Sequence, residues 1–438
     1  MKKIMMMLIA MSMSLSLMAC GNNAETGSKE NAVESNSAVT EEPVDEVPEE
    51  PDDKETASEN TTESEESSEE STQTTGLTVD ADYANLSESE GFEFESNGDG
   101  TCVLTKIGTC SDADIVIPEK SPDGDVITEI AEYAFYDAKD VNSIVFAGKT
   151  MELDNKAFAS CGVKKIVITG CELVVGESAF SYCEDINEVS INNSNLEIDS
   201  YAFYDSGKDM SVKIAGCTGI LNEKAFQSCG ITDLTISDSK LVTSDSAFAY
   251  CEDMTTALFE NSTVEIGSYV FYESGDDAAV TFIDCELDID DKGFQSSAIV
   301  TLSISGGETV MGDNAFSYCE DLTDVTIGSN NIEIGKYSFY DCTALVNVFL
   351  VADSEDDSMK VVIEDNAFQT CSVQNVVIGR GDIEIGDNAF SYCEDLVSVE
   401  IMGTLSDIGD YVFYDCPAEL AISYNGATYN KESIEDAK

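Results

Sequence analysis

The chain has 438 residues, with 87 acidic against 21 basic side chains, a formal net charge of −66 and no histidine. The scarcity of clustered Lys and Arg excludes nucleic-acid binding, and the absence of His excludes Ser-His-Asp or Cys-His catalysis and histidine-ligated zinc. Hydrophobic residues still make up 42% of the chain, so it can bury a large core.

The first 19 residues have the layout of an export signal. Lys2 and Lys3 precede an apolar stretch over 4–18, which is too short to span a membrane. Leu17-Met18-Ala19-Cys20 resembles a bacterial lipobox, and the resemblance implies cleavage before Cys20 and a lipid on its sulfur. The expected location is then the outer face of the bacterial cell membrane, exposed at the cell surface. An ordinary secretory signal with an incidental cysteine is the alternative.

Residues 20–75 are predicted to form an acidic, disordered tether. They consist mainly of Glu, Ser, Thr, Asn and Asp, with three prolines and almost no large apolar side chains. Such a segment buries too little apolar surface to offset its ordering entropy. A stalk and a solubilising spacer of no set length both fit this composition.

Residues 126–417 form a repeat array, with an N-terminal cap expected over 76–125 and a C-terminal cap over 418–438. A small residue followed by Phe recurs every 22 or 23 residues, with one step of 29 that marks an insertion near 351–359. The repeated positions are Phe135, Phe158, Phe180, Phe203, Phe226, Phe248, Phe271, Phe294, Phe316, Phe339, Phe368, Phe390 and Phe413. Blocks of three repeats also recur, which indicates growth by duplication of a triplet.

Each repeat contains V-x-I at the strand period of two, a polar turn, and I-x-I-G before the next Phe. A single repeat cannot bury its own apolar face, so neighbours must stack. We therefore expect the V-x-I segments of successive repeats to pair as a parallel sheet at ~4.8 Å spacing.

The consensus L-x-x-V-x-I with I-G-x-x-A-F-x-x-C resembles the BspA-like leucine-rich repeats, also called the Treponema pallidum type; residues 320–327 and 334–342 match closely. The resemblance implies a leucine-rich-repeat solenoid of about 13 repeats of 22–23 residues, with short parallel β-strands and short helical turns. It also implies a cell-surface protein used in adhesion, with no catalysis and no cofactor.

The chain has fifteen cysteines, nine of which lie three residues after a repeat Phe. Other repeats carry Ser or Ala there, so the position favours buried thiols over disulfides. Cys102 and Cys110, in the expected N-terminal cap, are the best candidates for a true disulfide, and whether they are bonded stays open.

Ligand contacts are expected on the outer face of the V-x-I sheet, because alternate side chains of a strand point to opposite faces. The candidate contact residues are Ser190, Lys213, Thr235, Thr281, Ser303, Thr326 and Glu400. The expected partner is a host extracellular protein, a glycan or another microbe's surface, and the chain is expected to be a monomer.

Acidic residues offer only a weak prospect of metal binding. Glu-Asp pairs recur once per triplet, about 14 Å apart, which is too far to share a cation, so we interpret them as a solvated surface. The insertion is a better place for weak calcium binding, through Asp353, Glu355, Asp356 and Asp357. No other metal site is expected.

Two further motifs have both a functional and a structural interpretation. Tyrosines recur near the repeat Phe. They either form an aromatic strip that binds a ligand or pack around the turn that contains the Phe. Arg380-Gly381-Asp382 uses the one arginine of the chain and resembles an integrin-binding tripeptide, but Gly-Asp also suits an ordinary turn.

The leading functional hypothesis is a lipid-anchored, adhesin-like interaction protein. One alternative is a β-solenoid enzyme that acts on polysaccharide through paired carboxylates. The repeats lack the long loops that usually build a catalytic cleft, which counts against it. The other alternative is a passive acidic surface protein without a specific ligand.

Overall fold

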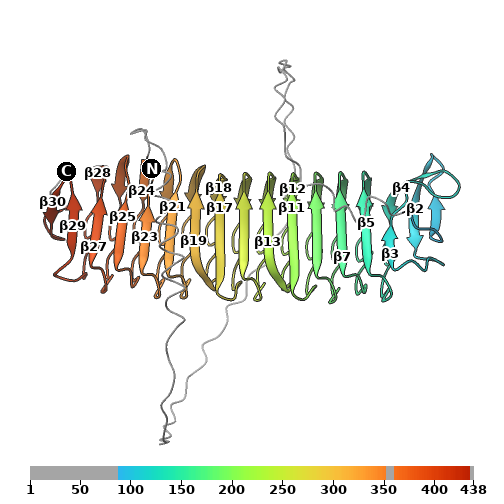
Figure 1. Ribbon diagram of the computed structural model, residues 1–438, viewed down its shortest axis with the longest axis horizontal. Helices are drawn as coiled ribbons and strands as arrows, with labels where there is room; N and C mark the ends of the chain where they lie inside the picture. Colours follow the sequence, from blue (N-terminus) through green and yellow to red (C-terminus); the bar gives the residue numbers. More distant parts are fainter. Residues whose placement is uncertain (1–86, 352–359, 435–438) are drawn as a thin grey trace, which may run out of the picture. The chain divides into compact units, whose positions relative to one another are not determined.

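The computed structural model describes residues 87–351 and 360–434. These residues form a β-solenoid in which successive coils each add one strand to each of two sheets (Figure 1). The export signal, the tether 20–75 and the insertion residues Asp353, Glu355, Asp356 and Asp357 lie outside the described residues. Within the described ranges, no helix is long and apolar enough to cross a membrane.

The first sheet, called sheet A here, contains the I-x-I segments. Its strands, in spatial order, are β1 (Glu93–Ser96), β2 (Thr101–Lys106), β4 (Val126–Ile130), β6 (Thr150–Leu153), β8 (Glu172–Val175), β10 (Asn195–Ile198), β12 (Thr218–Leu221), β14 (Lys240–Thr243), β16 (Thr263–Ile266), β18 (Glu286–Ile289), β20 (Glu308–Met311), β22 (Ile332–Ile334), β24 (Lys360–Ile363), β26 (Asp382–Ile385) and β28 (Thr404–Ile408). Only β1 is antiparallel to its neighbour.

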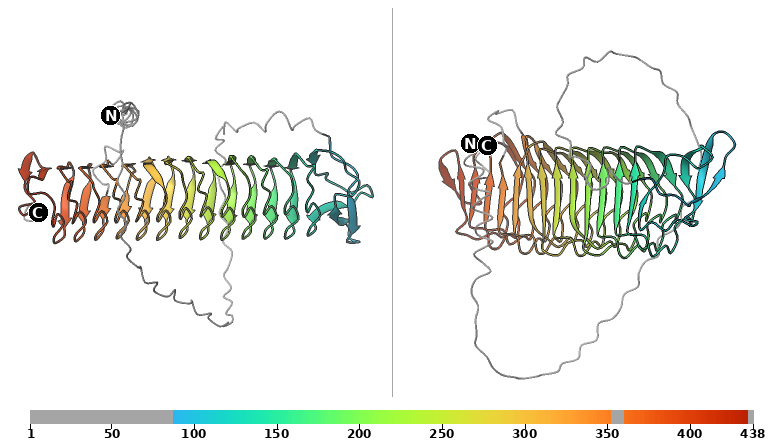
Figure 2. Two further views of the ribbon diagram at one scale, coloured as in Figure 1. Left: turned by 90° about the horizontal axis from the view of Figure 1, so that it is seen from below. Right: turned by 45° about the vertical axis from the view of Figure 1, so that its right-hand side comes forward.

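The second sheet, sheet B, contains the V-x-I segments. Its strands are β3 (Asp114–Val116), β5 (Ser143–Ala147), β7 (Lys165–Thr169), β9 (Glu188–Asn192), β11 (Met210–Ala215), β13 (Ile231–Ser237), β15 (Thr256–Glu260), β17 (Ala278–Ile283), β19 (Ile299–Ser305), β21 (Asp324–Gly328), β23 (Asn347–Leu350), β25 (Asn375–Ile378), β27 (Ser398–Ile401), β29 (Ala421–Tyr424) and β30 (Ala427–Tyr429). Only β30 is antiparallel to its neighbour. The strands of both sheets follow one another along the array (Figure 2).

The predicted parallel sheet of V-x-I segments is confirmed as sheet B. In β9, for example, Val189 and Ile191 are fully buried and Ser190 between them is half-buried. A second sheet of I-x-I segments was not predicted from the sequence. They form one because Leu196 and Ile198 of β10, like their counterparts in other coils, are buried against the same core.

The prediction of short helical turns was wrong, because the described residues contain no helix. In each repeat the residues two before and two after the Phe have positive φ, such as Lys156 (φ 59°) and Ser160 (φ 57°) around Phe158. A residue in the left-handed conformation at every fourth position interrupts the hydrogen-bond pattern of a right-handed helix. The segment instead forms consecutive turns, and the Phe158 N–H donates to the Ala179 carbonyl of the next coil at 2.8 Å. These turns make up a third side of each coil, called the Phe side here.

The repeat phenylalanines stack in one continuous column behind the Phe side. All twelve consecutive ring pairs have centroids 4.5–5.8 Å apart and nearly parallel planes. The thirteen side chains are at most 2% exposed. Each coil therefore completes the packing of its neighbours, as expected for stacked repeats.

All cysteines of the described residues carry free thiols, so Cys102 and Cys110 are not bonded to each other. The predicted row of buried thiols is confirmed. Most of these thiols donate to the Phe carbonyl of the preceding coil, as Cys251 does to Phe226 at 3.2 Å. The Ser206 hydroxyl makes the same bond to Phe180 at 2.7 Å. Either Cys or Ser can occupy this position because both are small hydrogen-bond donors.

Candidate ligand-binding face

The outward-facing residues in the middle of the sheet B strands form one straight line, called the central row here. Strand register places all seven predicted contact residues in this row. Its members from β9 to β27 are Ser190, Lys213, Thr235, Leu258, Thr281, Ser303, Thr326, Phe349, Val377 and Glu400. Lys213 and Glu400 are exposed, and the others are half-buried.

Sequence reasoning missed three members of the central row: Leu258, Phe349 and Val377. In β15 the motif reads Ala257-Leu258-Phe259, and in β23 it reads Val348-Phe349-Leu350, so three consecutive apolar residues hid the alternation. Alignment of the strand with its neighbours would have shown that the middle residue faces outward. The row therefore combines hydroxyl groups with aliphatic and aromatic carbon.

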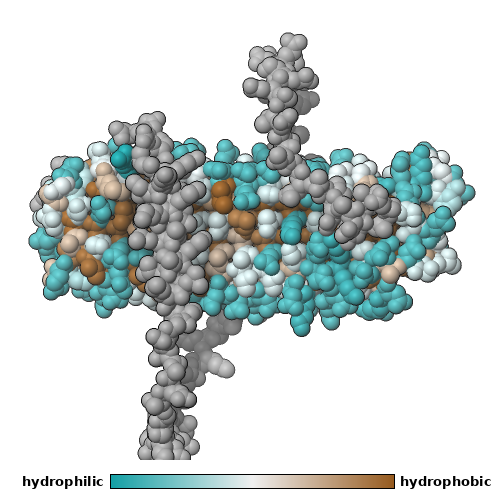
Figure 3. All heavy atoms as spheres, viewed as in Figure 1, coloured by the Kyte–Doolittle hydropathy of each residue, from teal (hydrophilic) through white to brown (hydrophobic). Residues whose placement is uncertain are grey.

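Between Thr235 and Val377 the central row contains no ionisable side chain across seven consecutive strands. The corresponding row of sheet A, from β14 to β26, contains four carboxylates: Glu265, Asp288, Glu333 and Glu384. The two sheets therefore differ in charge although both are built from the same repeats. In the space-filling view of sheet B, apolar patches lie between hydrophilic rims (Figure 3).

A second line of polar side chains borders the central row and is internally hydrogen-bonded. The Thr256 hydroxyl donates to Asp233 at 2.7 Å, and the Asn347 amide donates to Asp324 at 2.8 Å. Near the N-terminal end, the Ser143 hydroxyl and the Asn142 amide donate to Asp114 and lower the pKa of its carboxyl group. Carboxylates held in this way keep the border of the face ordered.

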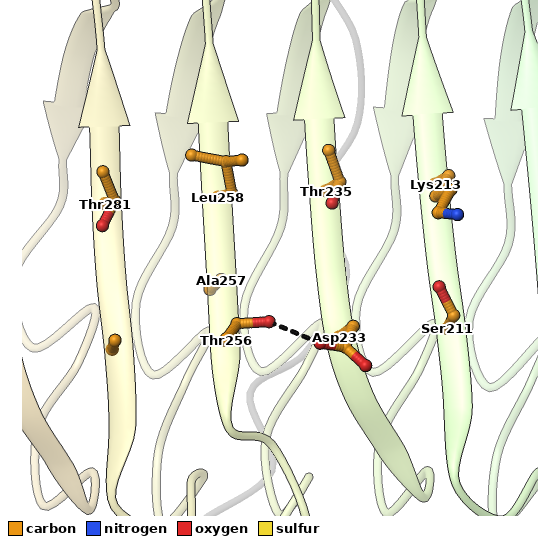
Figure 4. Close-up of a pocket in the computed structure, with 9 residues that line it drawn as sticks. Ser211, Lys213, Asp233, Thr235, Thr256, Ala257, Leu258 and Thr281 are labelled. Carbon is orange, nitrogen blue, oxygen red and sulfur yellow. Dashed lines mark hydrogen bonds between the residues drawn. The ribbon is translucent and has the colours of Figure 1, made fainter.

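A shallow depression of about 490 Å³ lies over β11 to β17, within this face. Lys213, Thr235, Leu258 and Thr281 of the central row line it, and the Thr256–Asp233 hydrogen bond closes its lower edge (Figure 4). The depression is open and crosses several strands, which suits contact with an extended ligand rather than enclosure of a small molecule.

Arg380 and Gly381 of the tripeptide Arg380-Gly381-Asp382 lie in the turn after β25, and Asp382 is the first residue of β26. Arg380 and Asp382 are exposed, whereas Gly381 is buried with φ +108°. The Gly381 carbonyl accepts a hydrogen bond from the Thr404 N–H of the next coil at 2.8 Å. The tripeptide is thus part of the regular coil rather than the tip of a projecting loop.

The periodic acidic pairs lie on the Phe side. Glu184, Asp185, Glu320 and Asp321 are all exposed, as the prediction of a solvated surface requires. Within 87–351 and 360–434, no three His, Cys, Asp or Glu side chains are arranged to hold a metal ion. Cys20 lies outside these ranges.

Comparison with known families identifies the repeats. The family described as "BspA type Leucine rich repeat region (6 copies)" matches residues 110–229, 218–346 and 361–434. The chain belongs to this family. The match covers most of the BspA-type array seen in Figure 1, including every strand that carries the central row except β23, which lies between the second and third matched ranges.

Several solved structures are similar to this BspA-type chain. A leucine-rich repeat protein from Bacteroides ovatus is 18% identical, covers 75% of this chain and 91% of its own, and has a TM-score of 0.36. A leucine rich cell surface protein from Faecalibacterium prausnitzii is 17% identical, with 78% and 96% covered and a TM-score of 0.25. The pneumococcal vaccine antigen PcpA is 14% identical, with 76% and 86% covered and a TM-score of 0.24. No curated protein matches the chain.

Proposed function

We propose that this chain is an exported, lipid-anchored surface protein that binds a protein or glycan of another surface through the central row of sheet B. The function is adhesion without catalysis. The observation that carries the proposal is the uncharged stretch from Thr235 to Val377 on a chain whose net charge is −66. Membership in the BspA-type family and the lipobox-like sequence before Cys20 support the surface location.

An uncharged face suits binding because burial of an unpaired charge against a ligand is costly. The hydroxyl groups of Thr235, Thr281 and Thr326 can hydrogen-bond to a neutral ligand, while Leu258 and Phe349 supply apolar contact. Sheet A offers no equivalent surface, because its acidic side chains would lose hydration on contact with any neutral partner.

The test compares one added charge on each sheet. Leu258 of β15 and Val242 of β14 are both half-buried, outward-facing aliphatic residues near the middle of the array. Leu258→Glu is expected to weaken ligand binding by about tenfold or more, because it places a carboxylate in the contact. Val242→Glu adds the same charge to sheet A and is expected to leave binding unchanged.

The measurement uses the full chain with Cys20→Ser, so that it is released without its lipid, on arrayed glycans and immobilised extracellular matrix proteins at physiological salt. Equal loss of binding in the two variants would contradict the assignment to sheet B. Binding no stronger than that of an unrelated protein of equal charge would favour the passive surface role. Hydrolysis of an arrayed glycan would favour the alternative that the chain is an enzyme acting on polysaccharide.

A further inference from the structure

Four clusters of three tyrosine rings stand on the Phe side, away from the central row. Their members are Tyr182, Tyr201 and Tyr204 (first cluster); Tyr250, Tyr269 and Tyr272 (second); Tyr318, Tyr337 and Tyr340 (third); and Tyr392, Tyr411 and Tyr414 (fourth). In each cluster the last ring meets the other two edge to face, with centroids 5.5–6.0 Å apart. The four clusters are nearly identical in geometry.

The fold does not require tyrosine at these places. The first two tyrosines of every cluster occupy the positive-φ positions, such as Tyr318 (φ 60°) and Tyr337 (φ 58°). Other coils fill the same positions with Lys, Ser, Asn, Thr, Asp or Glu, such as Asn314 and Thr370. A bulky side chain is unfavourable at positive φ, so the backbone conformation does not favour tyrosine over these residues.

Two clusters already hold a cation from this chain. The Lys224 ammonium lies 5.5 Å from the ring centroid of Tyr201. The Lys292 ammonium lies 5.1 Å from the ring centroid of Tyr269 and donates to its hydroxyl at 2.8 Å. The rings are thus oriented to receive an ammonium or guanidinium group.

The third cluster has the same rings without the lysine. The residue corresponding to Lys224 and Lys292 in the following coil is Asn366, and within the described part of the chain no lysine or arginine covers the Tyr337 ring. Tyr318 is 42% exposed and Tyr337 is 38% exposed, so both are accessible to an external group.

Exposed carboxylates lie within a few residues of the tyrosines in the sequence. Every cluster has a Glu-Asp pair two residues after its first tyrosine, and the four pairs are all exposed. A further acidic residue follows the last tyrosine, as Asp341 follows Tyr340 and Asp415 follows Tyr414. Near the fourth cluster, a hollow of about 420 Å³ is lined by Tyr411, Phe413, Tyr414, Asp415, Lys431 and Glu432, and the Lys431 ammonium there donates to the Cys416 carbonyl at 2.6 Å. Aromatic faces with acidic residues nearby in the chain favour cations over neutral or anionic groups.

We propose that the third and fourth tyrosine clusters, whose rings no lysine covers within the described residues, form a second binding surface that takes the lysine and arginine side chains of an extended basic polypeptide. These two clusters are three coils apart, about 14 Å, which an extended chain covers in about four residues. The matching sequence therefore carries two basic residues about four positions apart. A second copy of this chain does not fit, because its net charge is −66. The surface is separate from the central row and does not depend on the function proposed for it.

The test uses the full chain and a synthetic Gly/Ser peptide with arginine at every fourth position. A second peptide of the same composition has its arginines side by side. Because the chain contains no tryptophan, its intrinsic fluorescence comes from its 17 tyrosines, twelve of which belong to the clusters. The spaced peptide is expected to bind more tightly than the contiguous one at physiological salt and to change this fluorescence.

The double variant Tyr318→Leu with Tyr337→Leu is expected to weaken binding of the spaced peptide about 5- to 30-fold. Tyr337→Phe keeps the ring and is expected to bind within about twofold of the wild type. As a charge control, Glu320→Gln with Asp321→Asn should weaken binding more than Glu333→Gln with Glu384→Gln, which removes the same charge from sheet A. Leu258→Glu should not weaken it.

Equal affinity of the two peptides, or equal effects of the two charge variants, would show only general attraction to an acidic protein and would overturn the proposal. Unchanged binding by the tyrosine double variant would also overturn it. If the leucine variant does not fold, the two charge variants, which retain every tyrosine ring, decide the question.

Discussion

At the scale of single residues, the position three after the repeat Phe holds a small side chain, and in every repeat after the first it is a Cys or Ser that can donate a hydrogen bond. Cys251 and Ser274 occupy this position in adjacent coils, and each donates to the Phe carbonyl of the coil before it. A buried carbonyl without all its partners destabilises the fold, which explains why polar Ser and weakly polar Cys are both accepted at a site surrounded by Phe rings.

The thiols make the fold sensitive to alkali. Burial raises the pKa of the Cys251 thiol from 9.0 to about 12. In the unfolded chain the thiol ionises from about pH 9, whereas in the native state it stays protonated until about pH 12. The unfolded state therefore binds fewer protons above pH 9, and the free energy of unfolding falls by about 1.4 kcal/mol per pH unit per thiol.

Cys251→Ser tests this argument, because serine keeps the hydrogen bond and does not titrate. The free energy of unfolding of the variant, measured by urea denaturation, is expected to match that of the wild type within about 1 kcal/mol at pH 8. At pH 10.5 the variant should be the more stable of the two. A constant difference between the proteins from pH 8 to 10.5 would show that this thiol does not contribute to alkaline unfolding.

At the scale of the repeated element, the Phe column joins the coils into one folded unit. The Phe248 ring stacks on Phe226 at 5.2 Å and on Phe271 at 5.5 Å, so its removal affects three coils. The turns that present these rings have left-handed residues on both sides, and the cost of that conformation is offset by packing in the column.

Phe248→Ala is expected to reduce the free energy of unfolding by about 3–5 kcal/mol, because it leaves a cavity in a column that cannot collapse. Tyr250→Ala removes a ring of similar size two residues later, from the exposed edge-to-face contact with Tyr272. The Tyr250→Ala substitution should reduce the free energy of unfolding by no more than about 1.5 kcal/mol. Urea denaturation followed by circular dichroism gives both values, and equal costs would disprove the importance of the column.

At the scale of the whole molecule, charge opposes the stacked architecture. In sheet A, Glu265 is directly opposite Asp288. Like charges in such cross-strand positions are destabilising. Nearby, burial raises the pKa of the Asp290 carboxyl group, with further contributions from Asp288 and Asp291. The array tolerates this repulsion because its continuous core extends through every coil.

Added salt is therefore expected to stabilise the protein. An increase from about 10 mM to about 300 mM NaCl shortens the screening length from about 30 Å to below 10 Å, so repulsion between coils weakens. The thermal midpoint should rise, and Glu265→Gln with Asp288→Asn should raise it at low salt while reducing its salt dependence. A midpoint that is independent of NaCl would contradict this account of the charge.

Sequence alone determined the period, the strands of sheet B, the Phe and Cys positions and seven members of the central row. These features follow from local spacing, because alternation within a strand decides which side chains face the core. It did not reveal Leu258, Phe349 or Val377, whose apolar neighbours masked the alternation.

Only the tertiary structure decided the rest. The I-x-I segments form a second sheet, and the Phe segments form turns instead of helices, because their hydrogen-bond partners belong to the next coil, as in Phe158 N–H to Ala179. The stacking of coils likewise brings residues that are far apart in the sequence next to one another. They form an uncharged row on sheet B and tyrosine clusters on the Phe side. Such surfaces depend on which residues of different coils become neighbours, and a linear pattern does not contain that information until the register between coils is known.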